Sequence, residues 1–121
     1  MKRHIAQGEG EIMRARDLIE PGETAVVIFT HGLHFALQED GGGSTGNWKL
    51  NVKRQFDRVI ICHRRGSIEE NDVYIADADG IEGCEGEGRY VIRLKNVVRR
   101  GNATANWFMF GNGSQDPVQY L

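Results

Sequence analysis

The sequence contains no apolar run near the ~20 residues that a membrane-spanning helix needs. It has only two cysteines, Cys62 and Cys84, which are too few for a disulfide framework. The opening residues MKRHIAQGEGEIMRARD are basic but have no apolar segment behind them, so they do not resemble a secretory signal. These absences predict a reduced, cytoplasmic protein that has no membrane partner.

Catalytic motifs are missing as well. None of the three serines lies in a nucleophile-elbow pattern, and GGGSTGNWK lacks the Gly-Lys-Ser/Thr ending of a phosphate loop. His31 and His34 are three residues apart across a predicted turn, whereas Cys62 and His63 are successive and would point to opposite faces of a strand. A zinc site needs three or four converging ligands, and these residues offer fewer, so we predict no metal site. Because catalytic motifs are missing, we also predict no catalytic residue and no cofactor.

The acidic stretch DADGIEGCEGE does not match a calcium-binding loop. With Gly80 at the invariant glycine, Ile75 takes the place of the first aspartate and Gly86 that of the bidentate glutamate. A metal-dependent hydrolase that uses Asp77 and Asp79, or the histidines, is therefore kept only as a third alternative.

The sequence does contain strongly segregated charge. Its 121 residues, 40% of them hydrophobic, are enough for a single domain over residues 1–121, and the formal net charge is −2. Residues 48–65 carry six basic groups and one acid, residues 66–90 carry one arginine and eight acids, and residues 91–101 carry four basic groups and no acid. Such blocks can pair within the chain, pair with a second copy, or attract a charged partner.

Residue patterns predict a mainly β (α+β) fold: a small bent sheet or barrel of about seven short strands with one N-terminal helix. The helix is expected over residues 9–20, ended by Pro21. The β-branched run TAVVIFT (24–30) is typical of a strand buried on both faces, and we expect it to form a hairpin with LHFALQ (33–38). Further strands are expected over 57–64, 72–79, 89–97, 106–110 and 117–121, with glycine-rich breaks at 39–47 and 80–88 and a turn over 99–105.

The basic segments suggest a ligand-binding surface. Arg58 and Arg64 would share one face of a strand, and Arg93 and Lys95 would share the outer face of another. If those strands are neighbours, their cations could contact phosphates, and Trp48 could stack on a base. The competing interpretation is cross-strand pairing of these cations with the acidic block between them.

The aromatic run NWFMF (106–110) would send its side chains to both faces of a strand. Trp107 and Met109 would belong to the core, and Phe108 and Phe110 would reach a second apolar surface that could be a pocket, a helix contact or a subunit interface. Trp107 is also a sixth candidate ligand-binding residue, since its ring could line a pocket with Trp48. The second alternative for the whole protein is thus a homo-oligomeric domain with an aromatic interface and a small-molecule pocket.

The segments DRVIICHR, VYIADADGIE and RYVIRLKNV resemble, in that order, the middle strands of PUA-like barrels, the group with ASCH and EVE domains. Phe56-Asp57-Arg58 stands where a Gly-Asp pair is more typical of the group. The resemblance covers roughly residues 48–110 and implies recognition of RNA or a modified base. The first prediction is accordingly a non-enzymatic binding domain for nucleic acid or a nucleotide-like ligand, contacted through a basic strand face.

Overall fold

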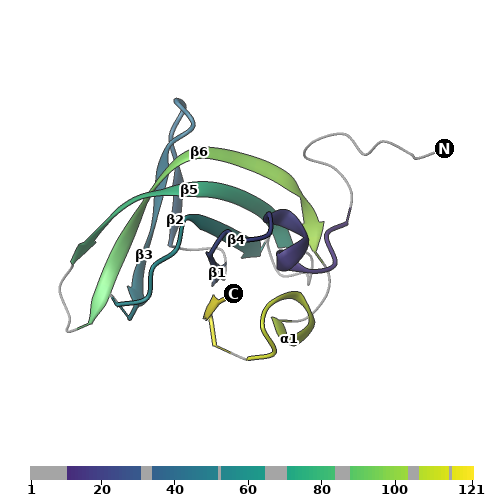
Figure 1. Cartoon of the computed structure of the whole chain (residues 1–121). Coiled ribbons are helices and arrows are strands. Elements are labelled where there is room, and N and C mark those ends of the chain that lie inside the picture. The colour runs from purple at the N-terminus through teal and green to yellow at the C-terminus, as the bar shows by residue number, and fades with distance from the viewer. Residues whose placement is uncertain are drawn as a thin grey trace.

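The computed structural model describes residues 11–30, 34–51, 53–64, 71–83, 88–103, 107–114 and 116–121. In this part of the chain seven strands form one mixed sheet in the order β2-β3-β6-β5-β4-β1-β7 (Figure 1). The elements are η1 (Ala15–Leu18, a 3-10 helix), β1 (Ala25–Thr30), β2 (Phe35–Leu37), β3 (Gly43–Lys49), β4 (Arg58–Arg64), β5 (Asn71–Gly83), β6 (Arg89–Ala103), α1 (Trp107–Phe110) and β7 (Val118–Tyr120). The predicted mainly β fold of about seven strands is confirmed, as a bent sheet that is not closed into a barrel.

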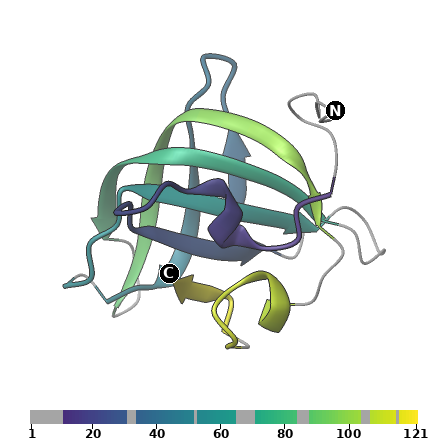
Figure 2. The same ribbon diagram turned by 45° about the vertical axis from the view of Figure 1, so that its right-hand side comes forward.

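The bend comes from the two longest strands, β5 and β6, which arch side by side across the molecule (Figures 1 and 2). Their pairing register shifts at three places, between Val73 and Tyr74, between Ile75 and Asp77, and between Ala78 and Ile81. Bulges of this kind increase the local twist of a strand pair and let one sheet curve over itself. The predicted break over 80–88 and the turn over 99–105 are wrong where the structure describes them, because β5 continues to Gly83 and β6 to Ala103.

The β1 strand lies inside the sheet, and all six of its residues are buried, as its apolar run predicted. It pairs in parallel with β4 and antiparallel with β7. The predicted hairpin between 24–30 and 33–38 is therefore wrong: β2 pairs instead with β3, with Phe35 opposite Thr45. The buried β1 pairs with β4, whose four central residues (59–62) are also buried, whereas the half-exposed β2 serves as an edge strand.

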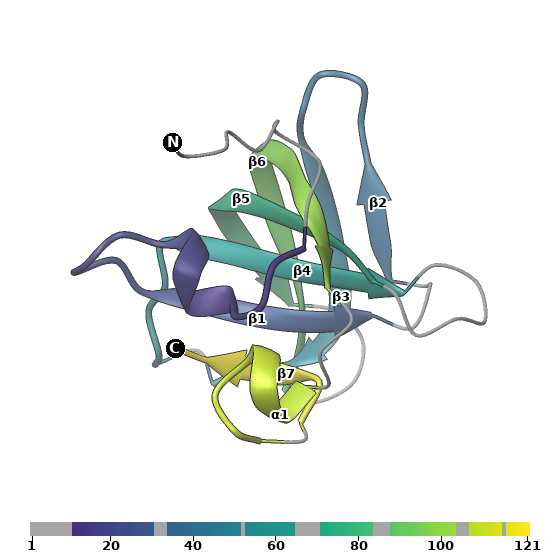
Figure 3. The same ribbon diagram turned by 90° about the vertical axis from the view of Figure 1, so that its right-hand side faces the viewer.

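Two apolar cores lie on the two faces of the sheet. The first contains Val27, Phe29 and Ile60 and is covered by η1 and α1, which Figure 3 shows on the same side of the sheet. The Phe110 ring of α1 meets Phe29 edge-on with ring centroids 6.1 Å apart. The second core fills the concave side and includes Val26, Ile28, Val59, Ile61, Trp48, Ile92 and Leu94.

Two predicted elements have the wrong form. The helix expected over 9–20 is a single 3-10 turn in the described residues, because Ile12 donates its backbone N–H to the Asn102 carbonyl oxygen and is held beside β6. The strand expected over 106–110 is the one-turn helix α1. Neither of these helices, nor any other helix in the described ranges, has the length and apolar character needed to cross a membrane.

The glycine-rich stretch 39–47 is a break between strands, as predicted, only in its first part. A tight turn over 38–42 connects β2 to β3, and residues 43–47 belong to β3. At Gly43 a Cβ atom would collide with the Ala36 carbonyl oxygen of the paired strand. This glycine is thus required by close approach of two backbones and not by flexibility.

Candidate functional site

Most of the predicted ligand-binding cations lie beside carboxylates of β5. Arg58 Nε is 3.0 Å from Asp77 Oδ1, without forming a hydrogen bond to it, and Arg58 Nη1 donates to Glu23 Oε2 at 3.2 Å. Both Arg58 and Asp77 are about two-thirds buried or more, so these contacts are structural. A phosphate could reach Arg58 only by displacing two carboxylates.

Arg93 and Lys95 are held much more loosely. Arg93 Nε is 3.8 Å from Glu82 Oε2, and Lys95 Nζ is 3.8 Å from Asp79 Oδ1. All four side chains are more than half exposed, and exposed pairs of this kind contribute little to stability. The cross-strand pairing expected as the competing interpretation is thus present, but these two pairs are easy to separate.

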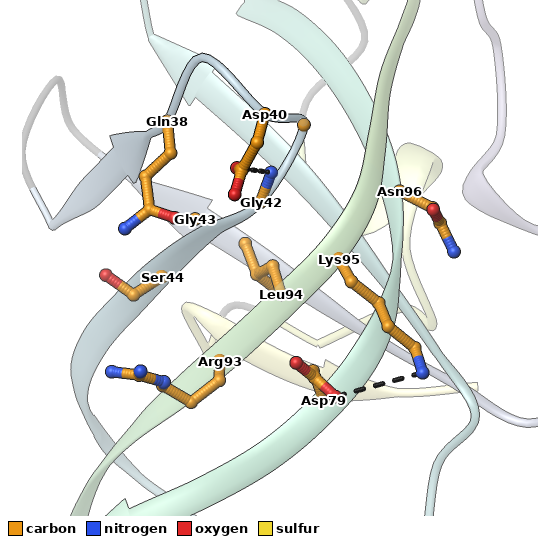
Figure 4. Close-up of a pocket in the computed structure, with 11 residues that line it drawn as sticks. Gln38, Asp40, Gly42, Gly43, Ser44, Asp79, Arg93, Leu94, Lys95 and Asn96 are labelled. Carbon is orange, nitrogen blue, oxygen red and sulfur yellow. Dashed lines mark hydrogen bonds and ion pairs between the residues drawn. The ribbon is translucent and has the colours of Figure 1, made fainter.

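Arg93 and Lys95 also line a polar hollow beside the β2–β3 turn, which we call the hairpin hollow (Figure 4). It measures about 230 Å³, and its other polar side chains are Gln38, Asp40, Ser44, Asp79 and Asn96. Ser44 lies opposite Arg93 in the β3–β6 ladder. The hollow contains as many carboxylates as cations, so it has no net charge of its own.

Arg64, another of the predicted ligand-binding residues, is not brought to these cations. Arg64 follows the alternation of Ile60 and Cys62, whose side chains belong to the core under η1 and α1. Its Nε atom is buried and has no hydrogen-bond partner in the part of the chain that is described. Trp107 begins α1, and its side chain lies outside what the structure describes.

A larger hollow than this one lies at the other end of β3, and Trp48 is in its wall. This aromatic groove has a volume of about 830 Å³. Its apolar wall is made by Trp48, Leu50, Pro117, Val118 and Tyr120, and its polar rim by Lys49, Asn51, Arg89 and Asp116. A mainly apolar hollow with a few polar groups at its rim is the usual form of a small-molecule site.

The two aromatic rings of the groove are held in place by hydrogen bonds. Trp48 is 8% exposed, and its indole Nε1–H donates to Thr45 Oγ1 at 2.9 Å. The Tyr120 hydroxyl accepts the Asn51 backbone N–H at 3.1 Å. The Arg54 guanidinium lies 4.4 Å from the centre of the Tyr120 ring. The Tyr120 ring therefore already has a cationic partner.

The rim of the groove differs from the predicted basic face in its electrostatics. Arg89 Nη1 donates to the Asn47 carbonyl oxygen, and neither Arg89 nor Lys49 has an ion pair with any residue that the structure describes. Asp116 is the single carboxylate among the lining residues. Two cations of the lining therefore face one anion, and Arg54, outside the lining, adds a third cation beside Tyr120. This charge favours an anionic ligand with an apolar, planar part.

A separate polar cluster lies where the parallel strands β1 and β4 end. The Thr30 hydroxyl and His63 Nδ1 are 2.5 Å apart, and Phe35 meets the imidazole edge-on at 5.3 Å between ring centroids. Burial lowers the pKa of His63, and the negative charge of its cross-strand partner Asp72 partly opposes this effect. A hydroxyl next to an imidazole resembles a nucleophile–base pair. Thr30 is only 1% exposed, however, so no substrate can approach its oxygen.

The described residues give no support to metal chemistry. No three His, Cys, Asp or Glu side chains among them lie close enough to hold a metal ion. Asp77, one of the two aspartates considered for a hydrolase, is bound to Arg58 and accepts a hydrogen bond from Asn96 Nδ2 at 2.8 Å. Burial raises the pKa of the Cys62 thiol, which is therefore a poor nucleophile.

Of the residues that line the groove, only Trp48 was predicted from the sequence. Lys49 belongs to the basic segment and directly follows Trp48, so its position was a usable signal. Arg89 begins the alternating strand 89–97, and its even spacing from Arg93 places both side chains on the same face of that strand. Arg89 could therefore have been grouped with Arg93. Tyr120 carried no signal, because only folding brings it to Asn51, 69 positions away.

No protein-family model, curated protein or solved structure matches this chain, so its resemblance to the PUA-like group stays a prediction.

Proposed function

We propose that this protein is a non-enzymatic binding domain for a nucleotide or for a nucleotide unit of single-stranded nucleic acid, held in the aromatic groove. The observation that supports it is the placement of Lys49 and Arg89, without ion pairs to described residues, at the rim of a wall that contains Trp48 and Tyr120. In this proposal the predicted ligand class is kept, but the principal site moves from the Arg58 face to the groove.

The groove offers separate contacts for the two parts of a nucleotide. Its apolar wall can pack against a base, and stacking of a base on an aromatic side chain contributes about 1–3 kcal/mol. Lys49 and Arg89 can bind the phosphate, Arg89 with two parallel N–H groups. The volume of about 830 Å³ lies within the range of small-ligand sites.

The overall negative charge of the chain limits the expected affinity. With a formal net charge of −2, the protein has no general attraction for polyanions, so binding depends on the local cations of the groove. We therefore expect a modest affinity that falls as salt concentration rises.

The test is a titration with purine and pyrimidine nucleoside monophosphates at low salt, followed by calorimetry and by tryptophan emission. We expect saturable binding that weakens about tenfold or more in the Lys49→Gln/Arg89→Gln double variant. Lys53→Gln, an exposed change outside the groove lining, is the matched control and should leave affinity unchanged. Binding that is equal in all three proteins, or absent in the wild type, would refute the proposal.

The chemical specificity of the site can be read from the same experiment. The nucleosides without phosphate and inorganic phosphate alone should each bind more weakly than the monophosphate, since each keeps only half of the contacts. If phosphate alone bound as tightly as the nucleotides, the aromatic wall would have no role and the site would be a simple anion site.

A further inference from the structure

The aromatic groove and the hairpin hollow lie at opposite ends of the same strand pair, β3 and β6. The groove is lined by Lys49 and Arg89, which are opposite each other in the ladder, and the hollow by Ser44 and Arg93, which are also opposite each other. Between these two pairs, two further pairs of opposite residues point inward: Trp48 with Tyr90, and Thr45 with Ile92. The outward face of the pair therefore runs from the Lys49–Arg89 rim of the groove to the hollow, past a register shift between Thr45 and Trp48.

Cations recur along this outward face of the β3–β6 pair. Arg89, Arg93 and Lys95 are separated by even numbers of residues on β6, so their side chains leave the same side of the strand. Ile92 and Leu94, at the alternate positions, are buried in the concave core. At ~3.3 Å per residue, the six steps from Arg89 to Lys95 span about 20 Å. This distance exceeds one nucleotide and suits a short polymer.

A phosphate can displace the carboxylates that pair with Arg93 and Lys95. Their separations of 3.8 Å and exposed side chains contrast with the 3.0 Å and 3.2 Å contacts of Arg58, whose side chain is only 25% exposed. In the hairpin hollow the Ser44 hydroxyl and the Gln38 amide add neutral hydrogen-bonding groups (Figure 4). Asp40 and Asp79 in the hollow, and Glu82 beside Arg93, oppose an anion, so the hollow would assist a ligand anchored elsewhere more than it would bind one alone.

We propose that the ligand is a single-stranded polynucleotide whose backbone follows the outward face of β3 and β6, from the aromatic groove to the hairpin hollow. This inference rests on the proposed function, because the groove supplies the anchoring nucleotide. Arg93 and Lys95 contact the phosphates of neighbouring units, and the length of the strand face sets the length of polymer that binds.

The test compares a nucleoside monophosphate with single-stranded DNA and RNA oligonucleotides of about four, eight and sixteen units, a range that covers the sites of known single-strand binders. We expect affinity to rise with length and then to level off. In the Arg93→Gln/Lys95→Gln variant the oligonucleotides should lose most of this gain, while affinity for the monophosphate should stay unchanged. Circular dichroism and thermal melting confirm that the variant is folded.

Two further measurements make the test sharper: the salt dependence of binding, and the effect of removing carboxylates in place of cations. Loss of two phosphate contacts should flatten the slope of log affinity against log salt concentration by about 1.4, at about 0.7 per contact. Asp79→Asn/Glu82→Gln removes the competing carboxylates and should tighten oligonucleotide binding without changing that of the monophosphate.

The outcomes separate the inference from the proposed function. Two results would refute binding of a polynucleotide along β3 and β6 but leave the groove proposal standing. In the first, the monophosphate binds and longer strands bind no better. In the second, Arg93→Gln/Lys95→Gln binds the longer strands as the wild type does. If the monophosphate does not bind but oligonucleotides do so through Arg93 and Lys95, the groove proposal is refuted, and with it the anchoring role of the groove in this inference. Absence of binding by every ligand refutes both.

Discussion

Arg58 and Asp77 face each other across β4 and β5, with Arg58 Nε 3.0 Å from Asp77 Oδ1. Arg58 also binds Glu23, which precedes β1, so one side chain connects three segments of the chain. Because its guanidinium is mostly buried, its role in the molecule is to neutralise two carboxylates. The residue that the sequence marked as a ligand contact is in this structure a contact that holds the sheet together.

Replacing Arg58 should accordingly affect stability and not binding. We expect Arg58→Gln to lower the free energy of unfolding by about 1–3 kcal/mol, since two partly buried carboxylates lose their partner. Arg93→Gln, which breaks a loose exposed pair, should change it by less than about 0.5 kcal/mol. Urea unfolding of both variants measures the difference. Equal stability of the two variants would show that the Arg58 contacts are as weak as those of Arg93.

The hydrogen bond of Trp48 can be tested in the same way. Thr45→Val removes the oxygen that accepts the buried indole N–H, whereas Thr45→Ser keeps it. A buried donor left without a partner costs about 1–3 kcal/mol, so Thr45→Val should be destabilised by that amount more than Thr45→Ser. Chemical unfolding followed by circular dichroism checks this. If the two variants unfold at the same urea concentration, the Trp48 hydrogen bond does not hold the groove wall.

His63 should make stability depend on pH. Burial lowers its folded-state pKa, so below the unfolded value of about 6.5 the unfolded chain binds more protons than the folded chain. The free energy of unfolding should therefore decrease as pH falls from neutral through 6.5 and level off below the folded pKa. His63→Asn should remove this part of the decrease, and His34→Asn, at an exposed position, should retain it. A decrease of the same size in His63→Asn would assign the effect to other groups.

Because β2 and β3 are in close contact, we expect one added methyl group to reduce stability strongly. Gly43→Ala places a Cβ against the Ala36 carbonyl oxygen, and backbone atoms cannot move aside as a flexible side chain can. We expect a loss of about 1–3 kcal/mol, typical of overpacking, while Ser44→Ala at the next position stays within about 0.5 kcal/mol. Thermal melting of the two proteins is sufficient. A stable Gly43→Ala variant would mean that the β2–β3 pairing is looser than the structure shows.

Local patterns were enough to predict the strands but not their partners. The alternation of Tyr90, Ile92 and Leu94 and the fully buried run 24–30 both appear in the structure as the sequence indicated. The parallel pairing of β1 with β4 was not predictable, because a buried apolar run carries no information on which other strand it meets. Likewise, the glycines of 39–47 have the composition of a flexible loop, although Gly43 is needed for close packing.

The candidate site shows the same limit. The basic segments identified the right region of the chain, since Trp48 and Lys49 both line the groove. Which cations are available for a ligand depends on the carboxylates that lie opposite them, and that is decided by the register of β4, β5 and β6. Tyr120 comes from the far end of the sequence and completes the groove only through the pairing of β7 with β1.

The most direct test of the proposed function is a map of backbone amide and indole resonances during titration with a nucleoside monophosphate. Shifts should concentrate on the Trp48 indole N–H and on the amides of residues 48–51, 88–89 and 118–120, which form the groove. Shifts confined to residues 93–96, or no saturable shift at all, would contradict a nucleotide site in the aromatic groove.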